Sequence, residues 1–114
     1  MGEVRWPGEW LRGVLELCVL GVLADGPTYG YAIATRLEEA GLGVVKGGTL
    51  YPLLARLELE ELVESSWAAG NGGPGRKYFT LTAHGREELA GRADLWDRFV
   101  QGTKRVIPRS QEVT

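Results

Sequence analysis

The chain has 114 residues, a formal net charge of −2 and a single cysteine. This length predicts one domain, residues 1–114, with a modest hydrophobic core, and no apolar run reaches the roughly 18 residues needed to span a bilayer. Because Cys18 cannot form an internal disulfide and no signal peptide is recognisable, we expect a protein of the reducing cytoplasm with no membrane partner.

The charges are distributed unevenly along the chain. Residues 40–57 carry only Lys46 and Arg56, and residues 65–86 carry basic side chains but no acid: Arg76, Lys77 and Arg86. If these two stretches share one face, they form a basic patch on an acidic protein, which can bind a phosphate backbone. So few charges predict weak, salt-sensitive binding per chain, which favours a dimer.

The first predicted helix covers residues 10–24. Its central run, residues 14–23, is apolar on nearly every side, which indicates burial against more than one neighbour. One side can pack into the chain's own core, and the other requires a second chain. Asp25-Gly26-Pro27 supplies turn residues that end this helix, and Thr28 is the candidate N-cap of the next.

A second, amphipathic helix is predicted over residues 29–40, with Gly41 as its stop. The linker that follows, residues 41–45, is so short that the next helix must meet the second at a steep angle. Two helices joined in this way form a helix-turn-helix, which places its second helix in the major groove of DNA.

The third helix, residues 46–57, is predicted to be that recognition helix. Four leucines recur at the i, i+3, i+4, i+7 spacing of a core-facing stripe: Leu50, Leu53, Leu54 and Leu57. The outward positions carry polar or basic groups and no acid: Lys46, Thr49, Tyr51 and Arg56. Gly47 and Gly48 precede the stripe, so a phosphate can approach the first N–H groups of the helix closely.

The periodicity then changes from helical to alternating. Residues 62–67 and 76–81 alternate with period two, which predicts two strands. Between them lies a glycine-rich tip, residues 68–75, for which no regular structure is predicted. Two strands around such a tip form a hairpin, and a hairpin directly after a helix-turn-helix is a wing.

Thr82 is predicted to cap a last helix, residues 83–107, which precedes a short tail at 108–114. Apolar or small residues recur along it at heptad spacing: Leu89, Ala93, Trp96, Val100, Thr103 and Ile107. Together with the spare face of the first helix, this seam predicts a homodimer about a two-fold axis. The predicted dimer contacts are Leu15, Cys18, Leu89, Ala93, Trp96, Val100 and Ile107.

The expected fold class is therefore mainly α with a small β-hairpin, a winged helix-turn-helix at residues 10–82 flanked by dimerisation helices. Four segments carry a resemblance to a known family: Leu11-Arg12-Gly13, Asp25-Gly26-Pro27-Thr28-Tyr29-Gly30-Tyr31, residues 48–58 and residues 75–85. They resemble the PadR family of bacterial transcription regulators, in its compact type with one C-terminal helix. Such proteins are winged-helix dimers that usually repress transcription and often release DNA when a small molecule binds.

The resemblance implies two sets of site residues. The double-stranded operator DNA would be contacted by Tyr29, Lys46, Gly48, Thr49, Tyr51, Arg56, Arg76, Lys77 and Tyr78. A cavity at the dimer axis, in which paired tryptophans stack a flat aromatic effector, would be lined by Trp10, Leu11, Val14, Trp96, Asp97 and Phe99.

Simpler interpretations stay open for several of these residues. Tyr51 can pack under the wing, Arg76 and Lys77 can be an ordinary solvated pair, and Trp96 can be a core anchor only. Cys18 and His84 are too few for a metal site, no catalytic set is recognisable, and we expect neither a cofactor nor an enzyme. The alternatives to a DNA-binding repressor are a winged-helix adaptor for another protein and a small-molecule carrier.

One position departs from the family pattern. The family commonly has a glycine between the recognition helix and the first wing strand, where this chain has Glu61. Because glycine permits a left-handed helix cap, the helix is expected here to run further or to end differently.

Overall fold

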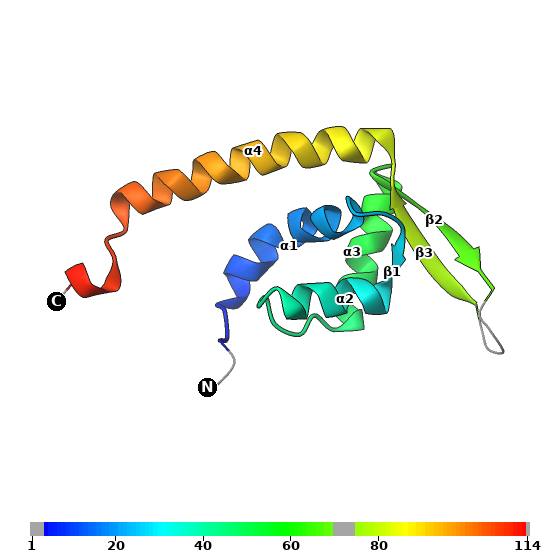
Figure 1. The fold of residues 1–114 in the computed structure, drawn as a ribbon, viewed down its shortest axis with the longest axis horizontal. Helices are drawn as coiled ribbons and strands as arrows, with labels where there is room; N and C mark the ends of the chain where they lie inside the picture. Colours follow the sequence, from blue (N-terminus) through cyan, green and yellow to red (C-terminus); the bar gives the residue numbers. More distant parts are fainter. Residues whose placement is uncertain (1–3, 70–74, 114) are drawn as a thin grey trace.

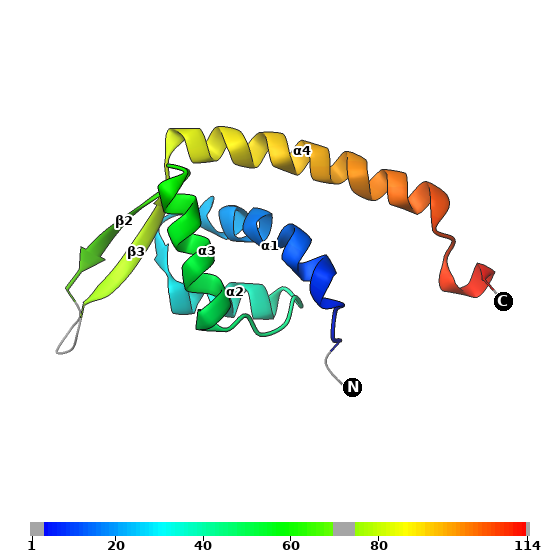
Figure 2. The ribbon, with the colours of Figure 1, turned by 180° about the vertical axis from the view of Figure 1, so that it is seen from behind.

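The computed structural model describes residues 4–69 and 75–113. In chain order the elements are α1 (Gly8–Leu23), β1 (Thr28–Tyr29), α2 (Gly30–Glu39), α3 (Gly47–Leu59), β2 (Val63–Ala68), β3 (Arg76–Leu81), α4 (Ala83–Val106) and a short 3₁₀ turn (Ser110–Glu112). Helices α1, α2 and α3 pack together, the β2–β3 hairpin projects from them, and α4 runs back over α1 (Figures 1 and 2). This architecture confirms the expected fold class. The predicted glycine-rich tip lies largely outside the described residues.

The sheet has three antiparallel strands in the order β1-β3-β2. The central strand, β3, pairs with β2 from Leu81 to Arg76, and with β1 through Thr28↔Phe79 and Tyr29↔Tyr78. Thr28 is thus a strand residue, and the prediction that it caps α2 is wrong. The N-cap is Tyr29, which makes no side-chain capping bond. Pairing with β3 holds this segment extended, so the wing is tied to the start of α2.

The core lies between the three packed helices and the inner face of the sheet. All four leucines of the predicted stripe on α3 are buried, which confirms it: Leu50, Leu53, Leu54 and Leu57. Leu15 of α1 is only 4% exposed and belongs to this same core. It was predicted as a dimer contact, and that prediction is wrong because its side chain is already covered within the chain. Cys18, also predicted there, is half-buried against the core.

Helix α3 ends in a left-handed residue even though that residue is not glycine. Glu61 has a φ of 61°. Its N–H donates to Glu58 O and the next N–H, of Leu62, donates to Leu57 O, both at 3.0 Å. These are the two hydrogen bonds of a Schellman cap, so the expectation that the helix would run further or end differently is wrong. The glutamate adopts the cap at a cost of about 1 kcal/mol.

Thr82 caps α4 as predicted, and it also joins α4 to the end of α3. Its hydroxyl accepts from the N–H of Gly85 at 2.9 Å and donates to the carbonyl of Glu61 at 2.7 Å. Leu89, in the third turn, packs against the core. Beyond it the helix exposes large apolar side chains: Leu95, Trp96, Phe99 and Val106.

Within the described residues, no helix combines the length and apolarity needed to cross a membrane.

Candidate nucleic-acid interface

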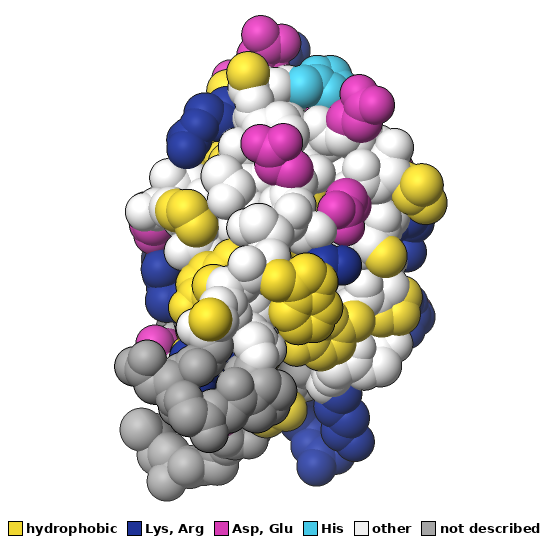
Figure 3. All heavy atoms as spheres, turned by 90° about the vertical axis from the view of Figure 1, so that its right-hand side faces the viewer, with side chains coloured by type: hydrophobic (Ala, Val, Ile, Leu, Met, Phe, Trp, Pro, Cys, Tyr) yellow, Lys and Arg dark blue, Asp and Glu magenta, His cyan; other side chains and the backbone are white. Residues whose placement is uncertain are grey.

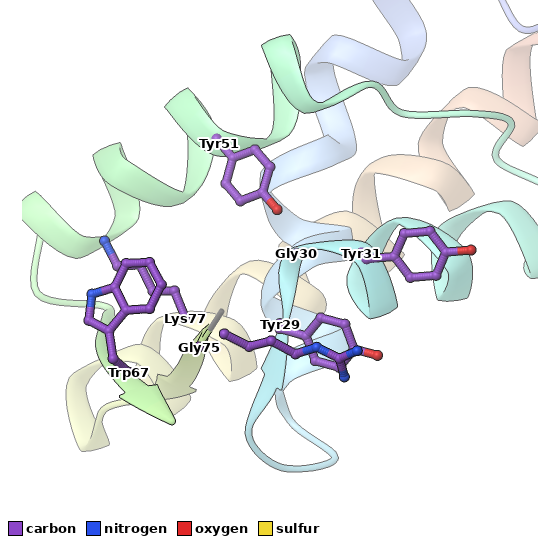
Figure 4. A pocket seen from close by; sticks show the side chains of 8 residues that line it. Tyr29, Gly30, Tyr31, Tyr51, Trp67, Gly75 and Lys77 are labelled. Atoms are coloured by element: carbon purple, nitrogen blue, oxygen red, sulfur yellow. The ribbon is translucent and has the colours of Figure 1, made fainter. Parts of the chain in front are cut away.

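A hollow of about 760 Å³ lies between the recognition helix and the wing. We call it the wing hollow, and its lining residues are Tyr29, Gly30, Tyr31, Tyr51, Trp67, Gly75, Arg76 and Lys77. Figure 4 shows Tyr51 reaching in from α3 on one side and Trp67 standing on the wing at the other. None of these described residues is acidic, and three carry a phenol hydroxyl. The surface can therefore donate hydrogen bonds and positive charge to an anionic partner.

Tyr51 of α3 reaches across to the start of α2. It is 52% exposed. Its ring lies against Gly30, where an added Cβ would stand 2.6 Å from Cζ and 2.8 Å from Cε1 of the tyrosine. Tyr51 thus leaves the core face, as predicted, and its ring contacts the start of α2. The Tyr51 ring can lie here only because residue 30 is a glycine and has no side chain.

Tyr29, Tyr78 and Arg76 form a second cluster, on the sheet. The rings of Tyr29 and Tyr78 meet edge to face with centroids 5.4 Å apart. The guanidinium carbon of Arg76 lies 4.5 Å from the centroid of the Tyr29 ring, a cation–π distance. This stacking holds a basic group of the wing over the N-cap residue of α2, and the remaining N–H groups of Arg76 can still donate to a phosphate.

The wing reaches α3 through Glu58. Its carboxylate accepts from the Ser65 hydroxyl at 2.6 Å and lies 3.8 Å from the ammonium of Lys77. Lys77 is the strand partner of Trp67, so both lie on the face of the hairpin that is turned to α3. Lys77 therefore lines the wing hollow with part of its charge already offset.

The structure brings most of the predicted DNA residues to one side of the molecule. Lys46, Gly48 and Thr49 are exposed at the first turn of α3, next to Tyr51. Apart from its chain neighbours and the nearby backbone of its own helix, no atom of the described residues lies within 4 Å of a Cβ built at Gly48, so that glycine leaves room for a partner.

Arg56 lies outside the wing hollow. Its guanidinium Nη2 lies 3.1 Å from Glu16 Oε2 on α1, and Arg56 does not line the wing hollow. The second oxygen of Glu16 lies 3.8 Å from Arg92 on α4, which also pairs with Glu88 at 2.9 Å. Arg56 therefore joins an ion-pair network that links α3, α1 and α4, and the structure does not support the DNA contact assigned to it.

Four residues of the wing hollow were not singled out from the sequence: Gly30, Tyr31, Trp67 and Gly75. Tyr31 is 75% exposed and Trp67 is 73% exposed. The sequence did contain a signal for Trp67. A large aromatic side chain at the end of a strand, beside a glycine-rich tip, is too far from the core to be buried there, which makes it a candidate for contact with a partner. For Gly30 no such signal existed, since its neighbour Tyr51 is distant in sequence.

Charge is also segregated on the end of the molecule that carries the hairpin. Figure 3 views this end, with most of the acidic side chains in the upper half. Lys and Arg side chains lie along the sides and the lower edge, around a group of hydrophobic side chains. The two kinds of charge are thus partly separated on this face.

Residues 19–91 match the transcriptional regulator PadR-like family. The chain belongs to this family. A PadR-like transcriptional regulator from Bacillus cereus is 34% identical, with a TM-score of 0.78 over 87% of this chain and 96% of that one. Bacillus subtilis PadR, solved in complex with operator DNA, is 30% identical, with a TM-score of 0.64 over 70% of this chain and 45% of that one.

The chain is much shorter than one of its relatives. An uncharacterized 37.1 kDa protein in a transposon of Streptomyces fradiae is 42% identical over 65% of this chain, which covers only 20% of that protein's length. Membership of the PadR-like family confirms the resemblance seen in the four sequence segments.

The effector cavity inferred from the PadR resemblance corresponds in part to a groove between α1 and α4. This α1–α4 groove has a volume of about 560 Å³ and is lined by Glu9, Trp10, Gly13, Trp96, Phe99, Val100, Thr103 and Ile107. The rings of Trp96 and Phe99 lie side by side, with centroids 5.9 Å apart and a tilt of 34°.

Only half of the residues predicted for that cavity line the groove. Trp10, Trp96 and Phe99 do so, whereas Leu11 packs against the core and neither Val14 nor Asp97 belongs to the lining. The groove of the single chain therefore gives no support to Leu11, Val14 or Asp97, and their place in a cavity at the dimer axis stays a prediction.

Proposed function

We propose that the protein is a sequence-specific, DNA-binding transcriptional repressor that acts in the cytoplasm as a homodimer on a pseudo-palindromic operator. The observation that carries this proposal is the wing hollow. It combines three tyrosine hydroxyls with Arg76 and Lys77, beside the exposed first turn of α3. The helix would lie in the major groove, and the wing on the adjacent minor groove or backbone.

The dimer is supported by the outer half of α4. Several large apolar side chains there and at the C-cap that follows are mostly exposed in the single chain: Leu95 at 62%, Phe99 at 63%, Val106 at 81% and the C-cap Ile107 at 65%. A second copy related by a two-fold axis would cover them with its own α1 and α4. The two recognition helices would then meet half-sites about 34 Å apart, one turn of the DNA helix.

The α1–α4 groove supports a response to a flat aromatic effector. Trp96 and Phe99 offer neighbouring ring faces, and the groove opens on the surface that we assign to the dimer. A ligand stacked there would alter how the two α4 helices pack, and so the spacing of the two recognition helices. Such a ligand should quench tryptophan fluorescence and lower the affinity for operator DNA at the same concentration.

DNA selection with the full chain tests the proposal. Random duplexes would be enriched for binding at low salt, where electrostatic affinity is greatest, and the enriched pool would be sequenced. We expect an inverted repeat, and binding that weakens steeply as salt rises. Failure to retain any duplex at low salt would overturn the proposal.

The adaptor alternative draws on the acidic run at residues 58–64. The structure weakens it, because Glu58 is already bound to Ser65 and close to Lys77. An adaptor that binds a protein and not DNA would retain no duplex at low salt, so the same selection separates the two hypotheses.

A further inference from the structure

We propose that Trp67 is a DNA-contacting residue that packs against the deoxyribose of the strand lying between the recognition helix and the wing. This inference rests on the proposed DNA-binding function and deepens it, because it names which part of the DNA the wing hollow receives.

The first support is the position of Trp67. It stands near the end of β2, is 73% exposed and does not belong to the buried core. Its ring lines the wing hollow on the side opposite Tyr51, with Lys77 beside it (Figure 4). A tryptophan exposed on a two-stranded hairpin contributes little to folding, whereas it can supply a large apolar contact to a partner.

The second support is the chemistry of the hollow. When a helix enters a major groove and a hairpin meets the adjacent minor groove, one backbone strand runs between them, over the space that separates the two elements. That strand alternates phosphates with sugars, which present C–H groups. Arg76, Lys77 and the tyrosine hydroxyls suit the phosphates. Trp67 is the described lining residue whose ring is broad, apolar and without a hydroxyl, and it suits the sugar.

The third support is the close pairing at the outer end of the hairpin. A Cβ at Gly75 would lie 2.8 Å from the carbonyl oxygen of Ala68 and 3.8 Å from Cε3 of Trp67. The absence of a side chain at Gly75 thus lets the two chain segments come together, while the tryptophan ring lies at ordinary contact distance. This close pairing lies directly beside the Trp67 ring, which lines the hollow.

The test compares three variants with the unaltered protein, using anisotropy of a labelled duplex at several salt concentrations. Trp67→Ala should weaken binding about tenfold, or about 1.4 kcal/mol. Because sugars are alike in every sequence and carry no charge, the loss should be equal on operator and unrelated DNA, with an unchanged salt slope. Trp67→Phe should recover most of the affinity.

Leu59→Ala is the matched control. Leu59 is 84% exposed at the end of α3 and does not line the wing hollow, so its removal tests the loss of any exposed apolar side chain. It should bind DNA as the unaltered protein does. Affinity of Trp67→Ala equal to that of this control, or a loss confined to the operator, would overturn the sugar contact.

A second measurement does not depend on how Trp67→Ala folds. With the other tryptophans replaced by phenylalanine, Trp67 alone reports its own exposure, and bound DNA should protect it from acrylamide quenching. Unchanged quenching in a complex that still forms would overturn the inference. Absence of any DNA binding by the unaltered protein would instead refute the proposed function, so the two failures are distinguishable.

Discussion

The ring of Tyr51 on the recognition helix rests on Gly30, the first residue of α2. An alanine Cβ at position 30 would come within 2.6 Å of Cζ in that ring, so the ring must move. Since Tyr51 is half exposed, it can swing away without disturbing the core. The contact with Gly30 therefore determines where the Tyr51 side chain points, and it contributes little to the free energy of unfolding.

Gly30→Ala is expected to weaken DNA binding several-fold while leaving the free energy of unfolding unchanged, or raised by about 0.4–1 kcal/mol because alanine suits a helix better. Binding would be followed by anisotropy and stability by urea titration. In a Tyr51→Ala background the same substitution should have no further effect on binding. An equal loss in both backgrounds would show that Gly30 acts by some route other than Tyr51.

Arg56 and Arg76 are expected to behave differently although both are exposed arginines. Arg76→Ala should lower the slope of log affinity against log salt by about one phosphate contact. Arg56→Ala should leave that slope unchanged, because Arg56 pairs with Glu16, and should cost at most about 1 kcal/mol of stability. A reduced slope for Arg56→Ala would restore the DNA role that the sequence indicated.

Glu61→Gly is expected to stabilise the protein by about 0.5–1 kcal/mol. Glutamate strains the left-handed cap, and glycine relieves that strain but adds freedom to the unfolded chain. Glu60→Gly is the control, since Glu60 has a φ of −81° and gains nothing from glycine. Thermal unfolding of both variants checks this, and a lower midpoint for Glu61→Gly would contradict it.

Burial raises the pKa of the Cys18 thiol above its ordinary value. A raised pKa means less thiolate at a given pH, and only the thiolate is alkylated readily. The folded protein should therefore react with iodoacetamide more slowly than the urea-unfolded chain at pH 8, with the rate rising only at higher pH. Mass spectrometry gives both rates, and equal rates would show that the thiol is freely exposed.

Phe99→Asp is expected to convert the dimer to a monomer, because it places a charge among the exposed apolar residues of α4. Gln101→Asp adds the same charge on the side of the helix that carries the Asp94–Arg98 ion pair, and should leave the dimer intact. Sedimentation velocity distinguishes the two. If both variants sediment like the unaltered protein, the dimer does not use this face.

Much of the fold could be predicted because its signals are local. The leucine spacing in α3, the alternation in the wing and the Thr82 cap each lie within a few residues. β1 could not be found in this way, since a strand of two residues shows no alternation. Leu15 was misassigned because a helix that is apolar on nearly every side does not reveal which side its own core covers.

The candidate site was predicted less completely because side-chain partners come from distant segments. Helical periodicity correctly placed Arg56 outside the core, but its partner Glu16 lies forty positions earlier in the chain. Tyr51 and Gly30 meet only once α2 and α3 have packed. Trp67 faces α3 because of its register with Lys77, which pairing of the strands decides.

The junction at Thr82 has a mechanical consequence. Its hydroxyl bridges Glu61 and Gly85, and any side chain at Gly85 would collide with the carbonyl of Leu62. These contacts fix the start of α4 to the end of α3. The 24 residues of α4 extend about 36 Å from that point. In the dimer that we propose, a small tilt of α4 where the two copies meet would displace the attached recognition helix and so change the distance between the two recognition helices.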